Sequence, residues 1–186
     1  FQRNRLTAPP TAGLTSDRTR LLELLIAEHA RDVREEPNGS NDSKDIRKYW
    51  GKTGISKKPW CCAFVSWGLN EVLARLPING THHLGVQRMW IEAKELGLET
   101  SEPKPGDVFI QIKDKGTGHT GFVVGVSEDG QTILTCEGNC GNRLKLGQRP
   151  RSSIDHFIDC IQDAQSNDFP RGSNLTFEDV SHEATR

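Results

Sequence analysis

Apolar residues recur every three or four positions in the first half of the chain, which is the spacing of helices with one buried face. The clearest stripe is formed by Val65, Leu69 and Val72. Thr, Ser and Gly at the boundaries supply suitable caps. Four helical segments are predicted. The first begins at Thr15 or Ser16, a short one lies at 45–50, and two longer ones span about 61–76 and about 86–96, the last ending before Gly97.

The pattern changes after Pro103-Lys104-Pro105-Gly106, where short runs of apolar and polar residues replace the helical spacing. Such runs, bounded by turn residues, are typical of β-strands. Helices that precede a group of strands indicate an α+β domain, in which N-terminal helices pack on a small antiparallel sheet. The predicted strands are 107–112, 119–126, 132–136, 143–146 and 157–161.

The chain has 186 residues, enough for one compact domain with tails. We assign the proline-containing residues 1–15 to a leader or linker and residues 16–162 to the folded domain. Residues 163–186 are polar and aperiodic, and we expect them to form a tail that adds nothing to the core.

Net charge and hydropathy exclude some classes of partner. A formal net charge of −1 and the lack of a long basic run argue against nucleic acid as the main partner. No apolar run approaches the ~18 residues that a membrane span requires. No signal peptide is visible, but the chain begins at Phe1, so a preceding segment can have been removed and export stays open.

Two adjacent cysteines, Cys61 and Cys62, follow Pro59 and Trp60 at the start of the second predicted helix. Successive helical residues are ~100° apart, and the apolar stripe centres nearer Cys62, which leaves Cys61 at its margin. A thiol in the first turn lies at the positive end of the helix dipole, which favours the thiolate. The sequence therefore predicts Cys61 as a nucleophile and Cys62 as a packing residue; the alternative is that both only pack.

A histidine at the start of a predicted strand is the candidate base. His119 shares one strand face with Gly121, Val123 and Gly125, whereas the other face is apolar. The glycines leave space beside the imidazole for another element or a substrate. We interpret the other five histidines, which lack this setting, as structural or exposed; they are His29, His82, His83, His156 and His182.

A turn at Glu128-Asp129-Gly130 brings a third group towards His119. Depending on the loop length, His119 lies opposite position 140, 139 or 138, so the segment 137–139 is within a residue or two of it. Glu137 and Asn139 would share a strand face, and either could orient the imidazole and stabilise imidazolium. Glu137 is our first choice, with Asn139 second or assisting.

The five cysteines permit two further interpretations. Zinc, whose usual ligands are thiolate and imidazole, has candidate ligands in Cys61, Cys136, Cys140 and His119, but a second ligand pair is missing. A disulfide between Cys136 and Cys140, or from either to Cys160, is a comparable alternative outside the cytoplasm. Our prediction is a site that needs no metal or cofactor.

Four motifs follow one another along the chain: Pro59–Trp67, Gly106-Asp107-Val108, Gly118–Gly125 and Glu137-Gly138-Asn139. In order and spacing they resemble CHAP domains (cysteine, histidine-dependent amidohydrolases/peptidases), which belong to the papain-related, NlpC/P60-like group. The resemblance covers about residues 16–161, and the segment 33–39 is similar to the lead-in of that family. Cys62 departs from the pattern, because a small residue such as alanine is common after the nucleophile.

The resemblance implies a papain-like fold and cleavage of an amide bond in bacterial peptidoglycan through a cysteine thioester. The enzyme would be an N-acetylmuramoyl-L-alanine amidase or an endopeptidase of the peptide stem or bridge. It would act at the bacterial cell wall as a phage lysin, wall hydrolase or antibacterial effector, with an inhibitor or immunity protein as a candidate partner. The alternatives are a small-amide cysteine amidase of the glutathione–polyamine type and a catalytically inactive wall-binding module.

Overall fold

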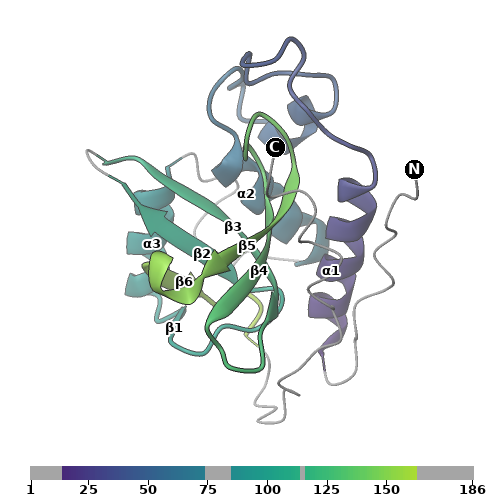
Figure 1. Ribbon diagram of the computed structural model, residues 1–186. Helices are drawn as coiled ribbons and strands as arrows, with labels where there is room; N and C mark the ends of the chain where they lie inside the picture. Colours follow the sequence, from purple (N-terminus) through teal and green to yellow (C-terminus); the bar gives the residue numbers. More distant parts are fainter. Residues whose placement is uncertain (1–13, 74–84, 114–115, 163–186) are drawn as a thin grey trace.

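A computed structural model describes residues 14–73, 85–113 and 116–162 of the chain (Figure 1). The predicted tail and nearly all of the predicted leader lie outside these residues. The elements in chain order are α1 (Ser16–His29), η1 (Ile46–Trp50), α2 (Cys61–Val72), α3 (Val86–Glu95), β1 (Glu99–Thr100), β2 (Val108–Ile112), β3 (Gly118–Val126), β4 (Thr132–Glu137), β5 (Lys145–Pro150), η3 (Arg151–Ser153) and β6 (His156–Ile158).

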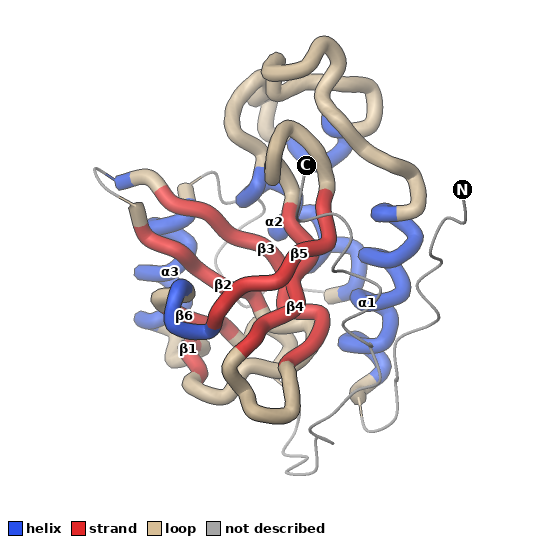
Figure 2. The backbone as a smooth tube through the Cα atoms, viewed as in Figure 1, coloured by secondary structure: helices blue, strands red, loops and turns tan. Residues whose placement is uncertain are grey.

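The six strands form one antiparallel sheet in the order β1-β6-β2-β3-β4-β5. Figure 2 shows the strands as a twisted layer with the helices around it. Helix α2 packs on β3 and on α1, whereas α3 packs on β2, β3 and β6. The predicted α+β class, with N-terminal helices on an antiparallel sheet, is confirmed. No helix among the described residues has both the length and the apolar character that crossing a bilayer requires.

Several boundaries differ from the sequence-based prediction. Helix α2 ends at Val72 because Leu73 adopts an extended backbone, and the predicted end at Leu76 lies outside the described residues. Thr15 occupies the N-cap position of α1 without a side-chain capping bond. Strand β5 extends to Pro150, four residues beyond the predicted end. The prediction stopped early because the residues at the end of this strand are mostly polar and show no alternating hydrophobic pattern. The two-residue strand β1 was not predicted.

Buried residues line both sides of the sheet because successive strand residues alternate in direction. Phe122 contacts α2 at Gly68, where an added Cβ would lie 2.9 Å from the Phe122 ring. The absence of a side chain at Gly68 therefore lets α2 approach β3 closely. A second cluster of buried residues comprises Phe109, Val123, Ile133, Ile154 and Phe157.

An aromatic cluster fixes the start of α2. The ring of Tyr49 in η1 stacks on Trp60 with centroids 5.5 Å apart and contacts Phe64 edge-on at 5.3 Å. The Tyr49 hydroxyl donates to a carboxylate oxygen of Glu28 at 2.5 Å, so this ring is held from α1 as well. Aromatic packing of this kind makes η1 and α1 a rigid support for the residues that begin α2.

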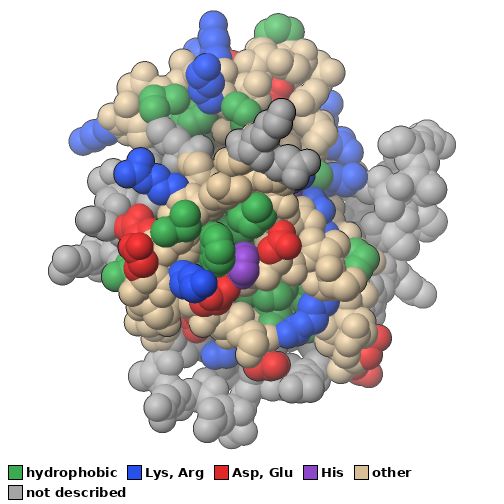
Figure 3. All heavy atoms as spheres, turned by 90° about the vertical axis from the view of Figure 1, so that its left-hand side faces the viewer, with side chains coloured by type: hydrophobic (Ala, Val, Ile, Leu, Met, Phe, Trp, Pro, Cys, Tyr) green, Lys and Arg blue, Asp and Glu red, His purple; other side chains and the backbone are tan. Residues whose placement is uncertain are grey.

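At the opposite edge of the sheet, α3 and β6 meet in a small surface cluster. Trp90 stacks on His156 with centroids 4.1 Å apart, and Nδ1 of His156 lies 2.6 Å from Oε1 of Glu99. Figure 3 shows the face on the α3 side, where hydrophobic, acidic and basic side chains lie next to one another. The contacts of His156 agree with its interpretation as a structural residue.

Candidate active site

The amino end of α2 places the Cys61 thiol beside His119. The first backbone bond of the helix runs from the Phe64 N–H to the Trp60 carbonyl at 2.9 Å, so Cys61 lies in the first turn. The Cys61 thiol lies beside the imidazole of His119, and its interaction with the ring helps to raise the pKa of His119. Cys62 is buried, and burial raises the pKa of its thiol well above the usual range. Both thiols are buried, and Cys61 is the member of the pair that lies beside a base.

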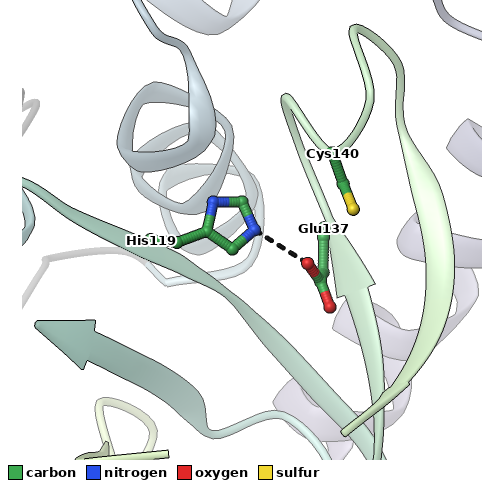
Figure 4. Close-up of side chains that lie close together, drawn as sticks. All are labelled: His119, Glu137 and Cys140. Carbon is green, nitrogen blue, oxygen red and sulfur yellow. Dashed lines mark hydrogen bonds and ion pairs between the residues drawn. The ribbon is translucent and has the colours of Figure 1, made fainter. Parts of the chain in front are cut away.

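On the other side of the imidazole lies a carboxylate. Nε2 of His119 is 2.7 Å from Oε2 of Glu137, the last residue of β4, as Figure 4 shows. Because Glu137 occupies Nε2, Nδ1 is the ring nitrogen left to face the Cys61 thiol. The side chain of Glu137 is 2% exposed and that of His119 is 12% exposed, so the carboxylate is sealed off while the ring retains an accessible edge.

The register of β3 and β4 explains this contact. Val126 pairs with Ile133, but an irregularity between Val123 and Gly125 shifts the register by one residue. The pairing of Phe122 with Cys136, continued along the strands, places Gly121 opposite Glu137. The connecting loop is also longer than two residues, since the Ser127 N–H donates to the Thr132 carbonyl at 2.9 Å.

Gly121 leaves the space that the Glu137 side chain uses. A Cβ at this position would lie 3.1 Å from Cγ of Glu137 and 2.7 Å from the Cys136 carbonyl oxygen. The sequence predicted open space beside His119 for another element or a substrate, and the structure shows that Glu137 occupies it. The carboxylate can therefore cross from β4 to the imidazole without displacing either strand.

Asn139 lies elsewhere, and the prediction that it shares a strand face with Glu137 is wrong. Strand β4 ends at Glu137, and Asn139 has a left-handed backbone with a φ of 57°. In the amide orientation that satisfies its neighbours, it donates to Oε1 of Glu35 at 3.1 Å and accepts from the Trp60 backbone N–H at 3.2 Å. Its contacts thus go to the segment before Cys61, and Glu137 holds the contact with the imidazole.

The ionisation of the pair follows from these contacts. Burial alone would lower the pKa of His119, but hydrogen bonds with Cys61 and Glu137 outweigh it and raise this pKa to about 9. Burial alone would raise the pKa of Glu137, but hydrogen bonds with His119, Arg149 and Thr135 outweigh it and lower this pKa to about 2. The pair is therefore an imidazolium beside a carboxylate at neutral pH, and an imidazolium stabilises a neighbouring thiolate.

The sequence analysis missed the contacts of three supporting residues. Arg149 and Thr135 bond the Glu137 carboxylate, and Glu35 supports Trp60 through a 3.0 Å bond from the indole Nε1 to Oε1. Arg149 could have been found from its position two residues after Gly147, because alternate residues of a strand lie on one face. It was missed because the predicted strand ended before it. The contact of Glu35 with Trp60 joins residues far apart in the chain, so no spacing indicates it.

The described residues hold one group that could ligate a metal: His119, Glu137 and Cys140, whose ligand atoms lie within 4.8 Å of one another (Figure 4). Arg149 places a guanidinium on the same carboxylate, and this fixed positive charge disfavours a resident cation. Cys136, another candidate zinc ligand, is outside the group and fully buried. All five cysteines are free thiols, so none of the three disulfide pairings considered as an alternative is formed.

Comparison with known proteins supports the resemblance. Residues 52–139 match the family model of the CHAP domain. No curated protein and no solved structure shows a significant match to the chain. The matched segment begins before α2 and ends just after β4, so it contains Cys61, His119 and Glu137 together with the elements that bring them into contact. The segment that contains the candidate site therefore matches the CHAP domain family.

Proposed function

We propose that the protein hydrolyses an amide bond of bacterial peptidoglycan at the cell wall, as an N-acetylmuramoyl-L-alanine amidase or an endopeptidase of the peptide stem or bridge. CHAP domains are generally amidases or peptidases, and peptidoglycan is their typical substrate. The observation that carries the proposal is the continuous chain of contacts from Cys61 through His119 to Glu137. Nucleophile, base and orienting carboxylate are the three groups that cysteine acyl transfer requires.

The reaction proceeds in two stages. In the reactive pair His119 already holds the proton that Cys61 has given up, and the thiolate attacks the carbonyl carbon of the amide. The imidazolium then donates its proton to the departing amine as the C–N bond breaks, which leaves a thioester on Cys61. Water, deprotonated by His119, releases the acid product. Glu137 keeps Nε2 protonated and the ring oriented throughout.

The start of α2 supplies a candidate oxyanion donor. The first N–H groups of a helix have no partner within the helix. Asn139 takes up the N–H of Trp60. The N–H of Cys61 lies in the next position, beside the thiol, and we assign it to the negative oxygen of the tetrahedral intermediate.

The test is digestion of purified peptidoglycan, followed by mass spectrometry of the soluble fragments. We expect fragments cleaved at one kind of amide bond, with Cys61→Ala as the inactive control. Cleavage at the lactyl–L-alanine bond would identify an amidase, and cleavage within the peptides an endopeptidase. If folded protein leaves peptidoglycan intact but hydrolyses small peptide amides, the small-amide amidase is the correct assignment. Sedimentation with walls but no hydrolysis of either substrate would indicate a binding module.

A further inference from the structure

The Glu137 carboxylate is surrounded by donors on both oxygens. Oε1 accepts from the Thr135 hydroxyl at 2.5 Å and from Nε of Arg149 at 2.7 Å. Oε2 accepts from Nη2 of Arg149 at 2.5 Å and lies 2.7 Å from Nε2 of His119. An ionised carboxylate offers about four acceptor positions, and here all four are used. The carboxylate consequently has one orientation that satisfies every partner.

The pairing of β4 and β5 builds this arrangement. Thr135 pairs with Gly147 and Ile133 pairs with Arg149, so the side chains of Thr135, Glu137 and Arg149 lie on one face of the sheet. Gly147 lies between them, and a Cβ there would be 3.1 Å from the Thr135 hydroxyl and 3.2 Å from Oε1 of Glu137. The missing side chain at Gly147 lets the guanidinium extend along the sheet to the carboxylate.

The guanidinium is held on a second side as well. It lies over the ring of Phe109, with the central carbon 5.3 Å from the ring centroid. The Arg149 side chain is 24% exposed, while Glu137 and Thr135 are buried. The planar guanidinium bonds the carboxylate through two nitrogens and lies on an aromatic face. It therefore fixes the plane of the carboxylate, which a lysine ammonium cannot do.

We propose that Arg149 is a positioning residue of the active site, which with Thr135 holds the Glu137 carboxylate ionised and aimed at Nε2 of His119. It touches neither substrate nor the reacting atoms, and it acts on the thiol through Glu137 and His119. The inference rests on the proposed function, because it assigns a role in the same cysteine chemistry. It extends the three-residue site to a relay of four, drawn from α2 and three adjacent strands.

The experiment measures the alkylation of Cys61 by iodoacetamide as a function of pH, with the modified residue located by peptide mapping. This readout needs no substrate, so it remains valid even if peptidoglycan proves to be the wrong one. Loss of Arg149 removes two donors from a buried carboxylate, so Glu137 in Arg149→Met should be protonated at higher pH. We expect the acid limb of the alkylation profile to move to higher pH by about one unit. Arg149→Lys should restore part of the shift.

The second readout is steady-state hydrolysis of the substrate that the digestion experiment identifies. We expect Arg149→Met to lower kcat by about 10- to 100-fold with little change in KM, and Thr135→Val to lower it by about 10-fold or less. Arg151→Met is the matched control, since Arg151 lies over Phe157 and bonds the Ser101 carbonyl away from Glu137. Thermal unfolding shows that each variant is folded.

The outcomes separate positioning from simple support of the fold. An alkylation profile for Arg149→Met that superimposes on those of wild type and Arg151→Met would overturn the proposal. The same holds if Arg149→Met lowers the melting temperature while kcat and the acid limb stay unchanged. Full recovery by lysine of both the profile and kcat would also contradict it, because bidentate geometry would then be unnecessary. If wild-type protein hydrolyses no substrate, but Arg149→Met still shifts the alkylation profile as expected, only the proposed function is contradicted.

Discussion

On the sheet side of the active site, His119, Glu137 and Arg149 come from three adjacent strands, β3, β4 and β5. Their relative positions follow from backbone pairing, and glycines at 121 and 147 clear the space between them. The contacts are all between charged or titratable groups. This side of the site therefore governs where protons and charges lie.

On the helix side, Cys61 is positioned by loops. The segment before η1 pairs with the segment after β4, since the Glu35 N–H donates to the Asn142 carbonyl and the Leu144 N–H to the Val33 carbonyl, each at 2.9 Å. Glu35 receives the indole N–H of Trp60, and Asn139 bridges Glu35 to the Trp60 backbone. These contacts hold the start of α2, and hence the position of the thiol. The comparison suggests that damage to the sheet side changes protonation, whereas damage to the helix side changes geometry.

The largest effect is expected at the thiol, where the two sides meet. Cys61→Ala should abolish hydrolysis, because it removes the thiol that the first turn of α2 places beside His119. Cys62→Ala should keep substantial activity, since its buried thiol only packs and small-for-large changes in the core mainly cost stability. A turbidity assay on cell walls, with circular dichroism to check folding, measures both. Equal loss from the two changes in folded proteins would overturn the assignment.

The comparison is tested most directly by one change on each side. Glu137→Gln should lower activity by about 10²-fold or more, because it removes the charge that stabilises imidazolium. Asn139→Ala should cost less, since Asn139 acts on the thiol only through Trp60. Both losses should be smaller than that of His119→Ala. A greater loss for Asn139→Ala than for Glu137→Gln, measured as kcat/KM, would mean that thiol placement outweighs charge stabilisation.

The two sides also differ in how far the sequence predicts them. The alternation of β3 and the turn after it were enough to predict that His119 and Glu137 meet, because strand pairing follows from pattern and turn. The left-handed backbone of Asn139 ends that pattern, so its partner could not be found by counting residues. Arg149 was missed because β5 is polar on both faces and its length depends on pairing with β4. The contact of Glu35 with Trp60 arises from tertiary packing of a loop, which leaves no periodic signal.

The charge pair on the sheet side should also show in the pH dependence of stability. The pKa of His119 is raised from 6.5 to about 9, so its protonated form stabilises the folded state fully below about pH 6.5, and this contribution is lost as pH rises through about 9. The pKa of Glu137 is lowered from 4.5 to about 2, so its contribution is present above about pH 4.5 and is lost as pH falls through about 2.

Denaturant unfolding of wild type and His119→Asn across this range measures the effect. The difference in free energy of unfolding should be largest between about pH 4.5 and 6.5, on the order of 3 kcal/mol for the His119 shift, and should decline towards pH 9. Asn139→Ala, on the helix side, should lower stability by an amount that does not vary with pH in the same window. If the difference in free energy of unfolding between wild type and His119→Asn stays constant from pH 6 to 10, the charge pair is contradicted, because the pKa of His119, about 9, lies within this range.

The smallest effect is expected from metal removal, which probes the sheet side alone. His119, Glu137 and Cys140 could offer ligand atoms, but Glu137 already accepts from Thr135, Arg149 and His119, and the guanidinium repels a cation. Activity should therefore survive EDTA unchanged and vanish on alkylation with iodoacetamide, because the thiol, the imidazole and the carboxylate suffice for acyl transfer. Turbidity clearing before and after dialysis against EDTA measures this. Loss that zinc or calcium restores would show that a metal holds the site, and the Arg149 contact with Glu137 would then have to open to admit it.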